Sequence, residues 1–208
     1  MAISKKKDAH IWERDENDWY VEPVECSRAL FAEVPISGTV WDPACGMGRI
    51  VSSATSAGLC AYGSDIVYRG PMCDEVKDFL SLRTFPEFNS IVSNPPFGIA
   101  EQFVQKSLKI IPKGGYAAFI LPIVWMAGFS SKRNWMPSSP LRYVLPISPR
   151  PSMPPGAVIQ AGVKPGNGTK DFAWFVWQSG YNSAPEVKFL NTNPYKSEQK
   201  EMELDYAR

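Results

Sequence analysis

The stretch Gly38-Thr-Val-Trp-Asp-Pro-Ala-Cys-Gly-Met-Gly48 contains the feature that decides the fold. Its first four residues predict a short apolar strand ending at Asp42, and a helix of small residues follows from about Met47 to Ala57. Glycines at 46 and 48 allow the backbone to pass close to a ligand, and the helix start offers free N–H groups. The spacing differs from the G-x-G-x-x-G phosphate fingerprint, and no P-loop lysine is present. The stretch therefore predicts a strand–turn–helix unit that is either a plain turn or a site for a ligand other than phosphate.

Strands and helices continue to alternate on both sides of this turn. The periodicity of apolar residues predicts helices at 23–34 and 99–111 and a short one at 124–129. Apolar runs predict further strands at 59–63, 89–93, 116–121 and 172–178. This alternation predicts an α/β fold with a mainly parallel sheet, in which ligands bind at the carboxyl ends of the strands.

The length and composition fit one folded domain. The chain has 208 residues, of which 44% are hydrophobic and 21% are charged, as in globular proteins. We expect the domain to span residues 19–190, between a polar N-terminal arm at 1–18 and a polar tail at 191–208. Residues 131–170 hold 8 of the 19 prolines and show little periodicity. We therefore expect a long, partly irregular, Pro-rich and basic excursion in that segment.

Several kinds of protein are excluded by the composition. No run of 18 apolar residues suits a transmembrane helix, and the first twenty residues hold no apolar signal-peptide core. The four cysteines form no C-x-x-C pair and His10 is the single histidine, so we expect neither a metal site nor histidine-based catalysis. Free cysteines without a secretory signal are typical of a reducing compartment, so we expect a cytoplasmic protein that does not bind a membrane.

Charge is distributed unevenly along the chain, although the formal net charge is only +1. Residues 1–101 carry 9 basic and 15 acidic side chains, and residues 171–208 carry 4 basic and 6 acidic ones. In contrast, residues 102–170 carry 9 basic side chains and no acidic one. This acid-free segment is either a solvated face or a surface that contacts phosphate groups.

Two acids follow the glycine turn at positions suited to a nucleoside. Asp65 ends the second predicted strand, 23 residues after Asp42, where a carboxylate can accept hydrogen bonds from both ribose hydroxyls. Asp78 precedes Phe79, so it can accept a hydrogen bond from an adenine amino group while Phe79 covers the ring. Taken singly, Asp65 is equally a surface acid at a strand end, and Asp78 is equally a helix cap.

The tetrapeptide Asn94-Pro-Pro-Phe97 is the sharpest chemical feature, and it follows the strand predicted at 89–93. Two prolines fix the backbone and remove two N–H donors, so the carbonyl groups left there only accept hydrogen bonds. The Asn94 amide oxygen and the Pro95 carbonyl can both accept from one planar NH₂ group, and Phe97 offers a ring face for stacking. The alternative is a rigid turn with one buried phenylalanine. The set suits a substrate amine attached to an aromatic ring.

In this order, the residues resemble the motifs of class I S-adenosylmethionine-dependent methyltransferases, and most of all the branch that methylates N6 of adenine in DNA. The segment Trp19-Tyr-Val-Glu-Pro23 resembles the family's N-terminal motif, which packs over the methionine end of the cofactor. The resemblance covers about residues 19–125, and the compact size is similar to that of phage-type enzymes. It implies a single-domain Rossmann-like methyltransferase fold, with helices on both faces of the sheet and an antiparallel late strand. It also implies S-adenosyl-L-methionine as the cofactor. The catalytic residues that it implies are Asn94, Pro95, Pro96 and Phe97, and the cofactor-binding residues are Tyr20, Pro23, Asp42, Ala44, Cys45, Gly46, Gly48, Asp65, Ile66, Asp78 and Phe79.

The chain departs from that family pattern in two ways. Only 23 residues separate Asp65 from Phe88, so the helix and strand usually found there must be shortened. No separate target-recognition domain fits in the chain, which leaves residues 126–170 to read the target. The expected partner is nucleic acid, with DNA favoured over RNA, and the oligomeric state is not indicated. The candidate substrate-binding residues are Lys132, Arg133, Arg142 and Arg150.

The expected reaction is in-line transfer of a methyl group to the amine of a flipped-out or single-stranded base. Other functions stay open. The N-P-P-[FY] motif also occurs in methyltransferases that act on base amines in RNA or on a glutamine amide in release factors. A catalytically silent relative that binds nucleic acid shares the same fold. A Rossmann-type oxidoreductase fits less well, because the glycine spacing differs.

Overall fold

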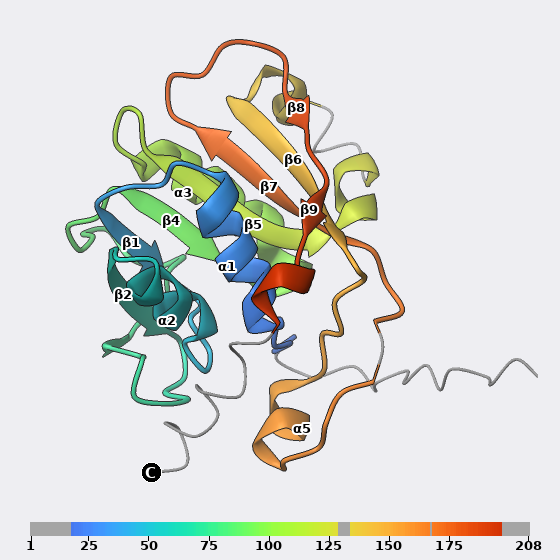
Figure 1. Ribbon diagram of the computed structural model, residues 1–208. Helices are drawn as coiled ribbons and strands as arrows, with labels where there is room; N and C mark the ends of the chain where they lie inside the picture. Colours follow the sequence, from blue (N-terminus) through green and yellow to red (C-terminus); the bar gives the residue numbers. More distant parts are fainter. Residues whose placement is uncertain (1–17, 129–133, 167, 197–208) are drawn as a thin grey trace, which may run out of the picture.

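The chain folds around an open mixed β-sheet (Figure 1). The computed structural model describes residues 18–128, 134–166 and 168–196, so the predicted arm lies, apart from Asp18, outside the described residues. The described strands follow the order β3-β2-β1-β4-β5-β7-β6-β8, and β9 also pairs with β6. The strands are β1 (Thr39–Asp42), β2 (Cys60–Asp65), β3 (Glu75–Val76), β4 (Ser90–Ser93), β5 (Tyr116–Pro122), β6 (Leu141–Ser148), β7 (Phe172–Gln178), β8 (Glu186–Val187) and β9 (Leu190–Asn191). The helices are α1 (Val24–Glu33), α2 (Arg49–Ser56), α3 (Ala100–Ile110) and α5 (Gly156–Gln160), with 3-10 turns η1 (Phe97–Ile99), η2 (Ile123–Ala127), η3 (Met136–Ser138) and η4 (Asn193–Tyr195).

Most of the long strands run in one direction. β1 pairs in parallel with β2 and β4, and β4 pairs in parallel with β5. β7 is antiparallel to both β5 and β6, which confirms the predicted antiparallel late strand. The ends of β1, β2, β4, β5 and β6 and the start of β7 therefore lie along one edge of the sheet, termed here the carboxyl edge.

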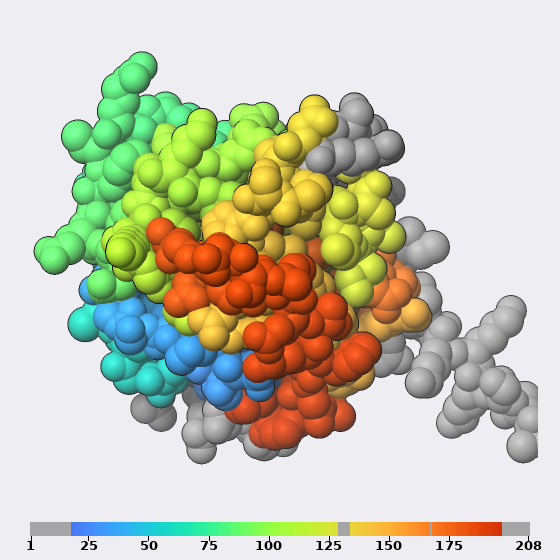
Figure 2. All heavy atoms as spheres, turned by 90° about the horizontal axis from the view of Figure 1, so that it is seen from above, coloured from blue at the N-terminus to red at the C-terminus, as the bar shows by residue number. Residues whose placement is uncertain are grey.

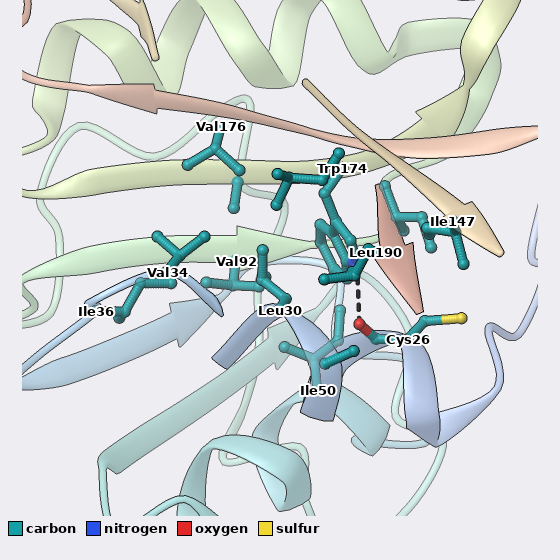
Figure 3. Packing of buried hydrophobic residues seen from close by; sticks show 14 of the residues in the cluster. Cys26, Leu30, Val34, Ile36, Ile50, Val92, Ile147, Trp174, Val176 and Leu190 are labelled. Carbon is teal, nitrogen blue, oxygen red and sulfur yellow. Dashed lines mark hydrogen bonds between the residues drawn. The ribbon is translucent and has the colours of Figure 1, made fainter. Parts of the chain in front are cut away.

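Helices cover both faces of the sheet, because alternate strand residues point to opposite sides. On one face, Leu30 of α1 and Ile50 of α2 pack with Trp174 of β7 (Figure 3). The indole Nε1 of Trp174 donates a 3.0 Å hydrogen bond to the carbonyl of Cys26, so its polar group is satisfied in the core. On the other face, α3 and η2 pack against the alternate strand residues, among them Phe175. The apolar runs of the central strands thus reflect burial on both sides.

The predicted strands and helices are present, and their ends differ from the prediction by at most two residues. One strand was not predicted from the sequence: within residues 131–170, expected to be partly irregular, Leu141–Ser148 form the eight-residue strand β6. Pro146 obscures this strand in the sequence, because proline lacks a ladder donor. β8 pairs with Tyr143 and Val144 and β9 pairs with Ile147 and Ser148, so Pro146 lies between these two short partners, where no donor is needed on that side.

The connection between Asp65 and Phe88 is shortened, as predicted. β3 has two residues and pairs in parallel with β2, and residues 77–89 form no helix. Lys106 of α3 holds this loop, because its Nζ donates hydrogen bonds of 2.9 and 2.7 Å to the carbonyls of Leu80 and Leu82. Burial lowers the pKa of Lys106 from its ordinary value. Lys106 therefore links the loop between β3 and β4 to α3.

The described part of the predicted tail packs onto the domain. β9 pairs with the end of β6, and the amide of Thr192 donates a 2.9 Å hydrogen bond to the carbonyl of Ser148. Figure 2 shows the C-terminal described residues (red) beside α1 (blue), and Lys188 forms a 3.0 Å ion pair with Glu33 of that helix. Among the residues that the structure describes, no helix has the length and apolar character needed to cross a membrane.

Candidate active site

A cavity of about 340 Å³ opens at the carboxyl edge, where β1, β2 and β4 end. Its volume lies in the range of small-molecule sites, roughly 300–1,000 Å³. Most of the predicted cofactor and catalytic residues line it: Tyr20, Asp42, Ala44, Cys45, Gly46, Asp65, Ile66, Asp78, Phe79, Asn94 and Pro96. Four predicted residues do not line it: Pro23, which precedes α1, Gly48, which precedes α2, the buried Pro95, and Phe97.

The two glycines of the turn are needed for different reasons. A Cβ atom at Gly46, where φ is +53°, would lie 3.0 Å from Nε1 of Trp19, another residue of the cavity wall. A Cβ atom at Gly48, where φ is +80°, would lie 2.1 Å from Cβ of Met72. Both positions therefore disfavour a side chain through backbone conformation as well as space. Gly48 was predicted to bind the cofactor, but it does not line the cavity. Its lack of a side chain allows the turn to pack against Met72 in the loop after β2.

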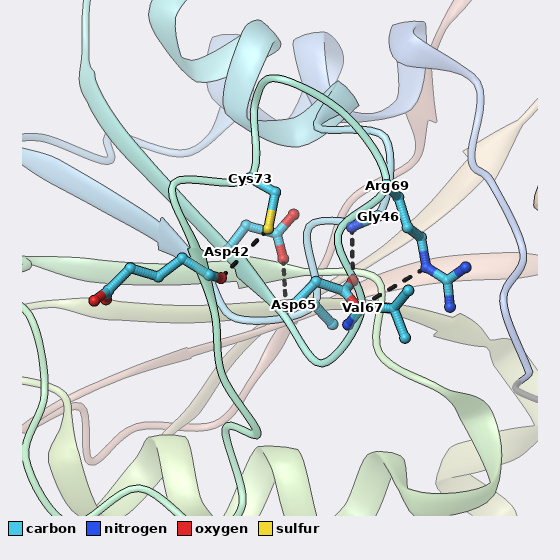
Figure 4. A network of polar contacts seen from close by, with 8 residues as sticks. Asp42, Gly46, Asp65, Val67, Arg69 and Cys73 are labelled. Carbon is cyan, nitrogen blue, oxygen red and sulfur yellow. Dashed lines mark hydrogen bonds and ion pairs between the residues drawn. The ribbon is translucent and has the colours of Figure 1, made fainter.

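Asp65 joins the end of β2 to the glycine turn (Figure 4). Its Oδ2 accepts a 2.9 Å hydrogen bond from the amide of Gly46, and its Oδ1 accepts one of 3.0 Å from the amide of Val67. Nε of Arg69 lies 3.9 Å from Oδ1. Each carboxylate oxygen has two acceptor sites, so both oxygens can still accept a hydroxyl donor from the cavity.

Asp42 is almost completely buried, with 1% of its surface exposed. Burial raises its pKa well above the ordinary value, although hydrogen bonds to Oδ1 from the Ser93 hydroxyl (2.7 Å) and the Ala44 amide (3.1 Å) oppose the rise. Ser93 thereby ties the end of β4 to the end of β1. Ser93 was not among the residues predicted for the site, and its place directly before Asn94 is the signal that points to it.

Asp78 and Phe79 lie together in the cavity wall, but they are held in different ways. Oδ1 of Asp78 accepts a 3.0 Å hydrogen bond from the amide of Leu80, as in a turn. Phe79 is 1% exposed, and its ring centroid lies 5.3 Å from that of Trp41 in an edge-on contact. Phe79 lines the cavity, and its packing against Trp41 holds the ring in place.

Asn94 follows the last residue of β4 and lines the cavity. Its Nδ2 donates two hydrogen bonds of 2.8 Å, one to the carbonyl of Tyr20 and one to Oε2 of Glu22. A carbonyl and a carboxylate both accept, which identifies the amide end that faces them. Both N–H protons are used, and Oδ1 remains as the acceptor of the group. This is the orientation that acceptance from a substrate amine requires.

The ring of Phe97 is already stacked in this structure. Tyr20 lies parallel to it, with ring centroids 5.9 Å apart and an interplanar angle of 8°. Phe172 of β7 approaches the same ring at 5.8 Å. The prediction of an open ring face for a substrate is therefore corrected, because a base reaches this side of Phe97 only if Tyr20 moves.

Residues 18–22, termed here the N-terminal strap, pass along the cavity wall. The amide of Val21 donates to the carbonyl of Pro154, and the amide of Gly156 donates to the carbonyl of Trp19, both at 2.9 Å. The guanidinium of Arg69 lies 3.9 Å above the centroid of the Trp19 ring. Three further cavity residues were not among the predicted site residues: Trp19, Glu22 and Arg69. The run 19–23 points to the strap as a whole, but nothing in it singles out Trp19 or Glu22.

The acid-free segment 102–170 does not form one surface. Arg142 lies near the start of β6, at the edge opposite the cavity, and donates to the side chain of Gln178 at the end of β7. Arg150 lies at the carboxyl edge and pairs with Asp171 through two hydrogen bonds of 2.6 and 3.2 Å. The structure thus brings Arg150, but not Arg142, to the cavity side of the sheet. Two further candidates, Lys132 and Arg133, lie outside the described residues.

The cavity wall combines five acids with three bases and apolar groups. The acids are Asp18, Glu22, Asp42, Asp65 and Asp78, and the bases are Arg49, Arg69 and Lys77. Burial raises the pKa of Glu22, and hydrogen bonding to Asn94 and the charge of Arg49 oppose that rise. A cationic ligand with a flat ring and hydroxyl groups suits this wall, because its charge offsets acids that are costly to bury. In the described ranges, no group of three His, Cys, Asp or Glu side chains could hold a metal ion.

Comparison with known proteins finds relatives in structure alone. No family profile and no curated protein matches the chain in sequence. A protein from Pyrococcus horikoshii assigned as an RNA methyltransferase matches with a TM-score of 0.57 and 12% identity, covering 83% of this chain and 93% of its own. A Listeria monocytogenes protein assigned as a class I S-adenosylmethionine-dependent methyltransferase matches with a TM-score of 0.53 and 15% identity, covering 85% and 69%.

A third solved structure is the M protein of the type I restriction enzyme EcoKI, with a TM-score of 0.53 and 15% identity. The match covers 85% of this chain and 49% of that protein, so this chain spans about half its length. Identities this low establish the arrangement of the strands and helices and nothing about the substrate. Together with the parallel strands and the antiparallel β7, these matches show that the chain has the Rossmann-like fold of the class I methyltransferases.

Proposed function

We propose that this protein transfers a methyl group from S-adenosyl-L-methionine to the exocyclic amine of a nucleic-acid base, with N6 of adenine in DNA as the favoured target. The observation that carries this proposal is the Asn94 amide. Tyr20 and Glu22 hold its nitrogen, so its oxygen is left to accept a hydrogen bond at a cavity beside Asp42 and Asp65.

The residues of the cavity fit this cofactor. Asp65 would accept hydrogen bonds from the ribose hydroxyls, and Asp78 with Phe79 would hold the adenine. Asp42 and the turn at Gly46 would hold the methionine end. The cofactor, when bound, supplies a methyl group activated by a sulfonium centre. The buried carboxylates of the wall offset its positive charge in a region of low dielectric.

The chain's own part in the reaction is to orient the amine. The lone pair of an exocyclic amine is delocalised into the ring, which makes it a weak nucleophile. Acceptance of an N–H group by Asn94 Oδ1 at the cavity wall favours a pyramidal nitrogen with its lone pair aimed at the methyl carbon. The Pro95 carbonyl, predicted as the second acceptor, belongs to a buried residue that does not line the cavity, so the proposal rests on Asn94. Positioning and electrostatics then supply most of the rate. As the N–C bond forms, the methyl–sulfur bond would break with its electron pair left on sulfur, and the extra proton on nitrogen would pass to solvent.

Basic residues in the segment between β6 and β7, which is hydrogen-bonded to the N-terminal strap, support a nucleic-acid substrate. The segment between β6 and β7 carries Arg150, Lys164 and Lys170, and all three are exposed. In Figure 1 this segment, with α5, extends away from the sheet. Such residues can contact the phosphates that flank a target base. An RNA base is the second candidate, because it presents the same amine and the Pyrococcus horikoshii neighbour is assigned as an RNA methyltransferase.

Transfer of a labelled methyl group to duplex DNA, single-stranded DNA, RNA and bulk protein in parallel tests this proposal. Nucleoside analysis should find 6-methyladenine in the DNA, with single strands methylated at least as fast, since a base in a duplex must first be flipped out. If the label is found in RNA alone, the substrate is an RNA base and the proposal of DNA as the favoured target is wrong. Label in protein alone, or no transfer by protein that binds the cofactor, contradicts the proposal.

A further inference from the structure

We infer that Glu22 is a positioning residue, whose carboxylate fixes the Asn94 amide so that Oδ1, and not the NH₂ group, faces the substrate. The predicted effect on methyl transfer rests on the proposed function. The orientation of Asn94 by Glu22 does not depend on which planar amine the site accepts.

The two ends of an asparagine amide have nearly the same shape and opposite hydrogen-bonding character. A rotation of 180° would turn donors toward the substrate amine, which is itself a donor, and the complex would lose its hydrogen bonds. The carbonyl of Tyr20 and the Glu22 carboxylate, each 2.8 Å from Nδ2, both require a donor. Two acceptors on one nitrogen therefore specify a single orientation of Asn94.

The position of Glu22 is itself fixed from two sides. Its carbonyl accepts a 2.9 Å hydrogen bond from Nη1 of Arg49 at the start of α2, and the next residue, Pro23, caps α1. The side chain is 6% exposed and lines the cavity. A carboxylate is costly to bury, and the N–H of Asn94 and the positive charge of Arg49 offset that cost. Glu22 therefore forms a rigid backing for Asn94.

A charged acceptor has a second effect on the amide. Hydrogen bonds to charged groups are stronger than neutral ones, and linked hydrogen bonds polarise one another. The hydrogen bond to the Glu22 carboxylate polarises the Asn94 amide and so increases the electron density on its Oδ1. Replacement of Glu22 by glutamine keeps an acceptor oxygen without the charge, whereas alanine removes both.

The first test does not depend on catalysis. The Asn94 side-chain amide protons are followed by ¹⁵N NMR in the full chain, with solvent exchange measured in the wild type, Glu22→Gln and Glu22→Ala. We expect slow exchange in the wild type and the glutamine variant and at least tenfold faster exchange in the alanine variant. Glu25→Ala is the matched control, since Glu25 is also buried but does not line the cavity. Equal exchange in all four proteins overturns the inference.

The second test separates positioning from structure. With the best amine substrate, kcat should fall a few-fold in Glu22→Gln and about 100-fold in Glu22→Ala, comparable to the loss of one preorganised hydrogen-bonding group in other enzymes. The KM for the amine substrate and Tm should stay close to the wild type, and kcat is measured at saturating cofactor, because both variants also remove one of the acids of the cavity wall. A loss of kcat that is equal in the two variants, or that follows a loss of folding, contradicts a positioning role. If the NMR pattern holds but no nucleic acid is methylated, the proposed function fails while the contact stands.

Discussion

The amide of Gly46 donates a 2.9 Å hydrogen bond to the carboxylate of Asp65, so the acid at the end of β2 closes the glycine turn that follows β1. The two strands pair in parallel with Asp42 beside Gly63, which brings their ends to the same edge. Ser93 adds the end of β4 through its hydrogen bond to Asp42. These hydrogen bonds, together with the backbone of the turn between Asp42 and Gly46, join three strand ends around the cavity.

Replacement of Asp65 should weaken cofactor binding. Asparagine at this position keeps one acceptor oxygen but cannot serve Gly46, Val67 and a ligand hydroxyl equally well. Loss of a charged hydrogen bond costs about 1.5–3 kcal/mol, so we expect roughly 10- to 100-fold weaker binding of S-adenosyl-L-methionine by calorimetry. Asp74→Asn is the control, because Asp74 accepts from the amide of Gly63 outside the cavity wall. Equal affinities in both variants would contradict the assignment of Asp65.

Alanine at Gly48 should destabilise the fold more than alanine at Gly58. Both glycines have φ near +80°, and the left-handed backbone alone costs an alanine about 1–2 kcal/mol. A Cβ atom at Gly48 also meets Met72 at 2.1 Å, whereas nothing lies within 4 Å at Gly58. Urea unfolding of the two variants measures the difference. Equal losses of stability would show that the contact with Met72 is unimportant.

Cofactor affinity should increase with pH. Burial raises the pKa of Glu22 above its ordinary 4.5 and that of Asp42 well above 3.8, so both carboxyls keep protons to higher pH than free acids do. A cationic ligand favours their ionised forms, and its binding must therefore release protons. Affinity should rise as pH increases above these ordinary values and level off once both groups are ionised. Calorimetry in buffers of different ionisation enthalpy counts the protons, and a pH-independent affinity without proton release would contradict this electrostatic account.

Replacement of Arg150 should weaken nucleic-acid binding and reduce its salt dependence. Each phosphate contact removed lowers the slope of log affinity against log salt by about 0.7–0.9. Arg142→Ala is a matched control, because Arg142 belongs to the same acid-free segment but lies at the opposite edge of the sheet. Titration of labelled oligonucleotides at several salt concentrations tests both variants. A smaller slope for Arg142→Ala than for Arg150→Ala would contradict the placement of the binding surface.

The sequence is sufficient to predict the residues at strand ends, because a parallel sheet brings those ends to one edge. Asp42, Asp65 and Asn94 meet at the cavity for this reason. Contacts between distant segments are not visible in such patterns: Glu22 and Asn94 are 72 residues apart in the chain. A run of basic residues likewise does not indicate at which edge of the sheet each residue lies. Arg142 lies at the edge opposite the cavity, although it belongs to the same acid-free segment as Arg150. Strand β6 was obscured by Pro146, whose position becomes acceptable only through the gap between β8 and β9.

The central claim is that Asn94 orients a substrate amine and does not hold the cofactor. The most direct measurement is the turnover of Asn94→Ala beside its cofactor dissociation constant, with Asn193→Ala as an exposed control outside the cavity. Loss of an acceptor that acts in the transition state should reduce kcat by about 10²–10³ or more, while the cofactor constant stays within a few-fold. Turnover of Asn94→Ala close to that of the wild type would contradict the account.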